Sequence, residues 1–149
     1  MEIVRATSND LPEILNLQKI AYQSEAELVD DYTIAPLTQT LDGITNDFNN
    51  GIILKAVENN EIIGSVRVYV YDNTLHICRL IVSPAHQNKG IGTALLHSAE
   101  ALYPKMRLEL FTSAKSERNL YLYKKNGYKE FKREPMNERV DFVFMEKYR

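Results

Sequence analysis

Apolar positions in the first third of the chain recur every three or four residues, which is the spacing of helices that bury one face. A short strand is expected at 2–5, and an amphipathic helix follows it to about residue 26. Asp10 and Glu13 have the spacing of a capping box at the start of this helix. A loop around Pro36 separates it from a weaker helix over 38–49.

The middle of the chain changes to the alternating pattern of strands. Three strands are predicted here, and the pairs Asn59-Asn60 and Asp72-Asn73 between them favour tight hairpin turns. The strands cover 52–57, 62–71 and 75–82. Because each hairpin joins two neighbouring strands, the pattern indicates an antiparallel meander.

Helical spacing returns in the last third and alternates with strands. Pro104 and the Asn126-Gly127 pair mark the expected helix ends. The expected elements are helices over 90–103 and 116–126 and strands over 106–112, 128–133 and 139–147. Because no repeat or linker interrupts the pattern, residues 1–149 are predicted to form one domain of the mixed α/β (α+β) class.

Composition and charge exclude some functions. The 149 residues carry a formal net charge of -2, so no global charge favours nucleic acid. The basic residues of the last third are interpreted as a solvated face. They are Lys115, Arg118, Lys124, Lys125, Lys129, Lys132 and Arg133. No segment has the length of a membrane span and no apolar signal stretch opens the chain, so we expect a cytoplasmic protein without a membrane partner.

Cys78 is the only cysteine, so no intrachain disulfide can form and a reducing compartment is expected. It falls within an apolar strand pattern, where a free cysteine is usually a small buried hydrophobe. His76 lies two residues away on the same strand, but we favour the buried role over a catalytic Cys-His pair.

The segment from Val82 to Thr93 carries the most specific chemical signal. A strand ends there, a polar turn with Gly90 and Gly92 follows, and an amphipathic helix begins. Amides at a helix start lack intrahelical acceptors and carry partial positive charge, and glycines let an anion approach them. The pattern predicts a phosphate or pyrophosphate site, although the glycines alone would equally suit a tight turn. A Walker loop and a Rossmann fingerprint fit poorly, because Thr93-Ala94 follows Gly92 and a third glycine is lacking.

The run Gln87-Asn88-Lys89-Gly90-Ile91-Gly92 resembles the pyrophosphate loop of the GCN5-related N-acetyltransferase (GNAT) superfamily, Gln/Arg-x-x-Gly-x-Gly/Ala. The preceding Leu80-Ile81-Val82-Ser83-Pro84 and a second block, from Ser116 through Tyr123 to Tyr128, are also similar to this family. The resemblance covers nearly the whole chain. It implies a GNAT-like single domain whose mostly antiparallel sheet of six to seven strands is flanked by about four helices.

The same resemblance implies a site for acetyl-CoA. Backbone groups of the strand before the loop would pair with the pantetheine arm, and amides of the loop would hold the pyrophosphate. The expected contacts are Leu80, Ile81, Val82, Gln87, Asn88, Lys89, Gly90, Ile91, Gly92 and Thr93. Ser116, which stands where the family commonly has asparagine, and Asn119, one helical turn further and able to substitute for that asparagine, are also expected contacts.

Tyr123 occupies the family position of a tyrosine near the thioester sulfur, where its phenol would protonate the departing thiolate. Arg79 stands where many members place a glutamate that relays the proton of the amine, so another group must be the base. Glu109 lies where some relatives carry a catalytic glutamate. His76 has a free pKa that suits a base near neutrality. These two residues are the candidates, and a water chain would also serve.

The N-terminal helix and the loop after it usually shape the acceptor site in this family. Tyr22, Glu25 and Tyr32 belong to that region, and its acidic residues would attract a cationic acceptor such as a polyamine or an amino sugar. Arg67 and Arg79 lie on strands and would instead pair with the carboxylate of an amino acid or a peptide terminus. The class of acceptor therefore stays open.

From these patterns we predict an acetyl-CoA-dependent N-acetyltransferase that moves the acetyl group directly to a primary amine of a small molecule or peptide, without a metal. The alternative is a non-catalytic coenzyme A-binding sensor or interaction module, which Arg79 in place of a glutamate suggests. Val140, Phe142 and Phe144 alternate on the last predicted strand. They would fit either the core or the seam of a homodimer, and we lean toward the homodimer.

Overall fold

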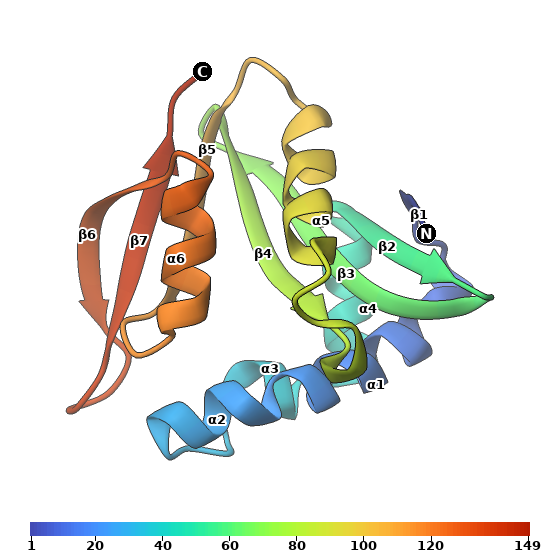
Figure 1. Ribbon diagram of the computed structural model, residues 1–149, viewed down its shortest axis with the longest axis horizontal. Coiled ribbons are helices and arrows are strands. Elements are labelled where there is room, and N and C mark those ends of the chain that lie inside the picture. The colour runs from blue at the N-terminus through green and yellow to red at the C-terminus, as the bar shows by residue number, and fades with distance from the viewer.

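Seven strands form one sheet in the computed structural model, which describes residues 1–149 (Figure 1). Their order is β1-β2-β3-β4-β5-β7-β6, and every neighbouring pair is antiparallel except β4 and β5. The strands are β1 (Glu2–Arg5), β2 (Ile52–Glu58), β3 (Glu61–Tyr71), β4 (Thr74–Val82), β5 (Arg107–Ser113), β6 (Lys129–Pro135) and β7 (Asp141–Lys147). The prediction of a mostly antiparallel sheet of six to seven strands is confirmed.

Six α-helical segments cover the sheet, and four of them are nine residues or longer. They are α1 (Leu11–Ala21), α2 (Gln23–Val29), α3 (Ala35–Thr38), α4 (Leu41–Asn49), α5 (Ile91–Ala101) and α6 (Glu117–Lys125). The helices α5 and α6 pack on one face of the sheet, and α1 and α4 pack on the other (Figure 1). The mixed α/β class and the expected set of about four substantial helices are therefore confirmed.

The hairpin turns have the backbone that their sequences predict. Asn59 and Asn60 have φ of 52° and 63°, and Asp72 and Asn73 have φ of 52° and 56°. Two consecutive residues with positive φ form a turn whose twist matches the twist of the flanking strands. The local turn chemistry thus fixes the register of the β2–β3–β4 meander, whose last strand leads to the site.

The N-terminal helical region differs from its prediction. The helix expected to end near residue 26 is divided at Tyr22, and α2 continues to Val29. The capping box predicted from Asp10 and Glu13 is wrong. The Asp10 carboxylate accepts a hydrogen bond from the Thr7 amide at 2.8 Å. The Glu13 carboxylate reaches the sheet and accepts from the Ile62 amide at 3.0 Å, because tertiary contacts replace the local ones.

The last strand turns its residues alternately to the two faces of the sheet. Val143 and Met145 face the core, whereas Phe142 and Phe144 are only partly buried and pack with Phe111 on the opposite face. The sequence pattern gave no sign of which face α6 would cover. Val140 is buried just before β7 begins. The homodimer stays a prediction.

Candidate active site

The site lies where β4 and β5 separate. These two parallel strands pair over three residues only, where Thr74–His76 of β4 lies beside Arg107–Glu109 of β5. Further along, β4 contains a bulge: Ser65 of β3 pairs with Ile81, and Arg67 pairs with Cys78, so Arg79 and Leu80 together oppose one residue. Arg79 has φ of 51°, a left-handed conformation that is uncommon for a residue with a side chain. The bulge bends β4 away from β5 and redirects the side chains that follow.

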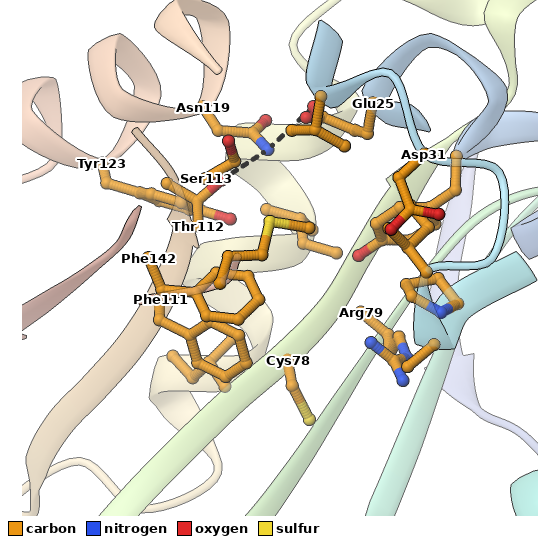
Figure 2. A pocket seen from close by; sticks show the side chains of 18 residues that line it. Glu25, Asp31, Cys78, Arg79, Phe111, Thr112, Ser113, Asn119, Tyr123 and Phe142 are labelled. Atoms are coloured by element: carbon orange, nitrogen blue, oxygen red, sulfur yellow. Dashed lines mark hydrogen bonds between the residues drawn. The ribbon is translucent and has the colours of Figure 1, made fainter. Parts of the chain in front are cut away.

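A cavity of about 460 Å³ occupies the opening between the two strands, and we call it the inner pocket. Its walls come from α2, α3, β4, β5, α6 and β7 and from the segments that precede α2, α3 and β7 (Figure 2). The 18 residues that line it are Tyr22, Glu25, Val29, Asp31, Ile34, Ala35, Pro36, Ile77, Cys78, Arg79, Leu80, Phe111, Thr112, Ser113, Asn119, Tyr123, Met136 and Phe142. The pocket is thus mostly apolar, with a few polar groups that can orient a ligand.

A second cavity of about 390 Å³ lies at the start of α5, and we call it the loop pocket. It is lined by Leu80, Val82, His86, Gln87, Asn88, Gly90, Ile91, Gly92, Thr93, Arg118, Asn119, Tyr121, Leu122 and Lys125. Leu80 and Asn119 line both pockets, so the two cavities adjoin at these side chains. A ligand longer than either cavity can therefore extend from the start of α5 to the inner pocket.

The loop pocket has the properties of a phosphate site. Gly90 caps α5 with φ of 80°, and a Cβ built on it would meet no atom within 4 Å, so the space before the helix amides is open. Those amides have no intrahelical acceptor and lie at the positive end of the helix dipole. Arg118 and Lys125 add positive charge, and His86 Nδ1 is buried without a hydrogen-bond partner. The pyrophosphate of a coenzyme A thioester fits these groups.

Most of the residues predicted to contact the cofactor line the loop pocket, but three do not. Ile81 is buried against α1, with only a small cavity of about 40 Å³ beside it. Lys89 lines neither of the larger pockets, and Ser116 lies at the far side of Glu25. Ile81 pairs with Ser65 of β3. Only those of its backbone groups that this pairing does not use can contact a cofactor.

Glu25 is held at the junction of the two pockets. Ser116 Oγ donates a hydrogen bond to Glu25 Oε1 at 2.8 Å, and Asn119 Nδ2 donates to the same oxygen at 3.3 Å. Asn119 also donates to Thr112 Oγ1 at 3.2 Å, as the dashed lines in Figure 2 show. The structure therefore gives Ser116 and Asn119 the task of fixing a carboxylate of α2 against α6.

Tyr123 is buried and lines the inner pocket, as Glu25 does. Burial raises the pKa of Tyr123 above its usual range, and the nearby Tyr22, Glu25 and Cys78 raise it further. Its ring packs edge-on against Tyr128 with the ring centroids 6.0 Å apart. The phenol is therefore rigid and neutral, as a proton donor must be.

The Cys78 thiol lines the inner pocket but is not activated. Burial raises its pKa to about 11, against the smaller opposing effect of Arg67 and Arg79. His76 does not pair with it, because the His76 ring stacks on Tyr69 and its Nδ1 lies 3.7 Å from Glu109 Oε2. A neutral thiol without a base is a poor nucleophile.

The two residues predicted as general bases lie together, but outside both pockets. His76 and Glu109 are register partners on β4 and β5. Cys78 and Phe111, two residues further along the same face of each strand, do line the inner pocket. Glu109 is moreover paired with Arg107 at 2.8 Å. Their position gives the predicted base role no support.

The two arginines predicted to bind the acceptor differ completely. Arg67 is only 3% exposed and donates hydrogen bonds to Asp47 and Gln39, each at 3.0 Å, and to Gln18. It fastens β3 to the N-terminal helices and does not line the inner pocket. Arg79 does line it. Of the three residues predicted to shape the acceptor site from the N-terminal region, Tyr22 and Glu25 line the inner pocket. Tyr32 does not line it and is 55% exposed.

Several site residues were missed by the sequence analysis. The aromatic wall of Phe111 and Phe142 comes from strands whose pairing the pattern did not reveal. Arg118 and Lys125, interpreted as part of a solvated face, line the loop pocket. Their separation by seven residues, two turns of α6, places them on one side of that helix and was a readable signal.

Two further findings concern metal ligands and membrane spans. No group of three or more His, Cys, Asp or Glu side chains is arranged to hold a metal ion. None of the helices combines the length and the apolar character needed to cross a membrane.

Comparison with known proteins agrees with this geometry. Residues 11–128 match the sequence model of the acetyltransferase (GNAT) family. No curated protein matches the chain. Among solved structures, the PaiA N-acetyltransferase of Thermoplasma acidophilum in complex with coenzyme A is similar, with a TM-score of 0.80 and 20% identity over 99% of this chain and 98% of that one.

Two other solved structures share the fold. The ribosomal-protein-S18-alanine N-acetyltransferase of Escherichia coli has a TM-score of 0.79 and 16% identity, over 99% of this chain and 92% of its own. A GNAT family acetyltransferase of Elizabethkingia anophelis with acetyl-CoA bound has a TM-score of 0.73 and 25% identity, over 99% of this chain and 97% of its own.

Proposed function

The chain belongs to the acetyltransferase (GNAT) family, and from this premise we propose that it transfers an acetyl group from acetyl-CoA directly to a primary amine of a small molecule or peptide. The observation that carries the proposal is the pair of adjoining pockets. The loop pocket suits a pyrophosphate, and the inner pocket that adjoins it is lined by Tyr123 and Glu25, the two groups that would handle protons. Family membership favours an enzyme over the non-catalytic coenzyme A-binding module.

The loop pocket accounts for binding of the donor. The first amides of α5, with Arg118 and Lys125, would hold the phosphates, and Gly90 keeps their approach free of side-chain atoms. The pairing of β4 with β5 ends at His76, so backbone groups of the later β4 residues that face β5 have no strand partner and would be open to the pantetheine arm. When bound, acetyl-CoA supplies the thioester carbonyl that the amine attacks.

Two side chains would manage the protons of the transfer. A bond forms between the amine nitrogen and the acetyl carbon, the carbon–sulfur bond breaks, and the sulfur takes a proton from the Tyr123 phenol. The nitrogen loses its second proton as the amide forms, and this proton restores the phenol. The ammonium form of the amine has no lone pair, so it must first lose a proton. Glu25 is the carboxylate in position to receive it, because Ser116 and Asn119 occupy only its Oε1. This role replaces the one predicted for Glu109 and His76.

Direct transfer is preferred to an acetylated enzyme for a structural reason. An acetylated enzyme would need a nucleophile such as the Cys78 thiol, which lines the inner pocket. Burial raises the pKa of this thiol to about 11, which keeps it protonated near neutrality. Intact-mass measurement after mixing with acetyl-CoA alone should therefore detect no added acetyl group.

The cytoplasmic location expected from the sequence stays a prediction.

The proposal is tested first by calorimetric titration of acetyl-CoA into the protein. Binding, followed by release of free thiol when primary amines are added, is the expected result. A folded protein that neither binds acetyl-CoA nor consumes it with any amine would contradict the proposal. Binding without consumption would instead favour the non-catalytic module.

A further inference from the structure

Arg79 is the cation of the inner pocket that no group of the chain neutralises. Ten ion pairs occur in the structure, and none of them includes Arg79. Its Nε is buried and has no hydrogen-bond partner. Arg67, close to it on β3, also has a buried Nε without a partner, but its two terminal nitrogens donate hydrogen bonds to Asp47, Gln39 and Gln18, whereas no hydrogen bond of Arg79 is found. A guanidinium with unused donors in a cavity is suited to an anionic group of a ligand.

The backbone holds Arg79 in this place at a cost. A positive φ at a residue other than glycine is unfavourable and persists only where the surroundings enforce it. The β4 bulge provides that enforcement, and it turns the side chain toward the inner pocket. Figure 2 shows Arg79 across the pocket from Phe111 and Phe142. An arginine positioned in this way is a built binding group rather than a surface charge.

The inner pocket therefore has a positive and a negative pole with an apolar wall between them. Glu25 is the negative pole, since Ser116 and Asn119 fix its carboxylate. Asp31 also lines the pocket and adds to this negative side, because Thr33 donates two hydrogen bonds, at 2.8 and 2.6 Å, to its Oδ1 alone. The wall consists of Phe111, Phe142 and Met136. A ligand that satisfies all three surfaces has an ammonium, an anionic group and an apolar body.

On this basis we propose that the acceptor is an amine that also carries a carboxylate, an apolar amino acid or a peptide of such residues, with the carboxylate on Arg79 and the amine directed to Glu25. A carboxylate is preferred to a phosphate, because a second negative charge would be repelled by Glu25 and Asp31, which line the same cavity. The proposal rests on the acetyltransferase function above. It removes the conflict between the acidic and basic signals by assigning each to one end of the same molecule.

Matched acceptors test the proposal directly. L-Phenylalanine is compared with phenethylamine, and L-methionine with 3-(methylthio)propylamine, so each pair differs only in the carboxylate. We expect kcat/KM to be about 100-fold higher for the member that carries it, since a site built for a polar group rejects an analogue that lacks it. The amide and the phosphonate analogue of phenylalanine should both be poorer acceptors. Equal or better use of the decarboxylated amines, or of the phosphonate, would overturn the proposal.

The variant Arg79→Gln assigns the preference to this residue. It keeps a polar side chain at the same backbone position, and we expect it to lower kcat/KM about 100-fold for phenylalanine while leaving phenethylamine nearly unchanged. The affinity for acetyl-CoA should not change. Arg133→Gln, an exposed arginine of β6 paired with Glu130, is the matched control and should have no effect. An equal loss for both acceptors would show that Arg79 supports the fold and would contradict the proposal.

The failure of this inference is distinguishable from failure of the function. Polyamines and amino sugars are included in the same thiol-release assay. If they are acetylated and amino acids are not, the enzyme is an acetyltransferase with a cationic acceptor and the inference is wrong. If acetyl-CoA does not bind at all, the proposed function itself fails.

Discussion

The loop pocket and the inner pocket adjoin at Leu80 and Asn119, yet they are built in different ways. The loop pocket takes most of its wall from one continuous stretch, from Val82 to Thr93, and its main binding groups are backbone amides. The inner pocket takes its wall from side chains of six separate elements. A backbone site depends on glycines and on the start of a helix, so it can be conveyed by a short motif. A side-chain site depends on the tertiary arrangement, and each residue in it can change the ligand.

The largest expected effect falls on the loop pocket. Gly90→Glu should weaken acetyl-CoA binding about 1,000-fold, because the new carboxylate enters the anion site and the left-handed backbone disfavours any side chain. The fold should survive, since a Cβ at Gly90 meets no neighbouring atom. Calorimetry measures the affinity, and thermal unfolding checks the fold.

Gly90→Asn is the control for this change. Asparagine tolerates positive φ and adds no charge, so its affinity for acetyl-CoA should stay within about tenfold of the original. If both variants bound acetyl-CoA as well as the parent, the start of α5 would not be the phosphate site.

The next effect distinguishes Arg67 from Arg79 by the stability that each variant loses. Arg67→Ala should lower the free energy of unfolding by about 3 kcal/mol, because it leaves buried partners of a hydrogen-bonded ion pair unsatisfied. The value is taken at the low end of the usual range, since Asp47 is 40% exposed. Urea unfolding measures it. Arg79→Gln should change stability by less than about 0.5 kcal/mol. Equal destabilisation by the two variants would mean that neither arginine is reserved for a ligand.

A smaller effect is expected for the proton donor of the inner pocket. Tyr123→Phe should lower kcat about 100-fold and leave the affinity for acetyl-CoA unchanged, because it removes only the proton donor. Burial raises the pKa of Tyr123, so the acid form that donates the proton persists as the pH rises past the ordinary tyrosine value of about 10. The alkaline side of the kcat profile should therefore show no loss from this group near that pH. Tyr71→Phe, on an exposed tyrosine of β3, is the control, and an unaltered kcat in Tyr123→Phe would exclude the acid role.

The difference between the pockets also explains what could be predicted from the sequence. The hairpin turns, the strand order of the meander and the loop before α5 depend on neighbouring residues, and local chemistry is enough to reveal them. The division of the first helix at Tyr22 has no local signal, since neither proline nor glycine stands there. Likewise, β7 lies between β5 and β6 because it pairs with β5, a strand far from it in the sequence, and no local pattern indicates that pairing.

The bulge at Arg79 marks the limit of pattern analysis within the site. Strict alternation would place Ile77 and Ile81 on one face of β4. In the structure Ile77 packs in the core under α5, and Ile81 packs against α1 on the other face, because the extra residue reverses the alternation between them. A reading of period two therefore cannot separate Arg79 from Arg67, although one lines the pocket and the other fastens helices to the sheet.

The smallest expected effect decides which pocket Ser116 serves. The family resemblance assigns it to the cofactor, whereas its hydrogen bond at 2.8 Å assigns it to Glu25. As a positioning residue it should affect the acceptor alone: Ser116→Ala should raise the KM of the acceptor about fivefold, the equivalent of one ordinary hydrogen bond of about 1 kcal/mol, with the affinity for acetyl-CoA unchanged.

A double-mutant cycle completes this test, because two residues that act through one contact do not add. In a Glu25→Gln background the Ser116→Ala change should have a clearly smaller effect on the acceptor KM. Weaker binding of acetyl-CoA in Ser116→Ala would return the serine to the loop pocket. The loop pocket would then depend on a side chain from the start of α6 as well as on backbone amides, and the contrast between the two pockets would be weaker.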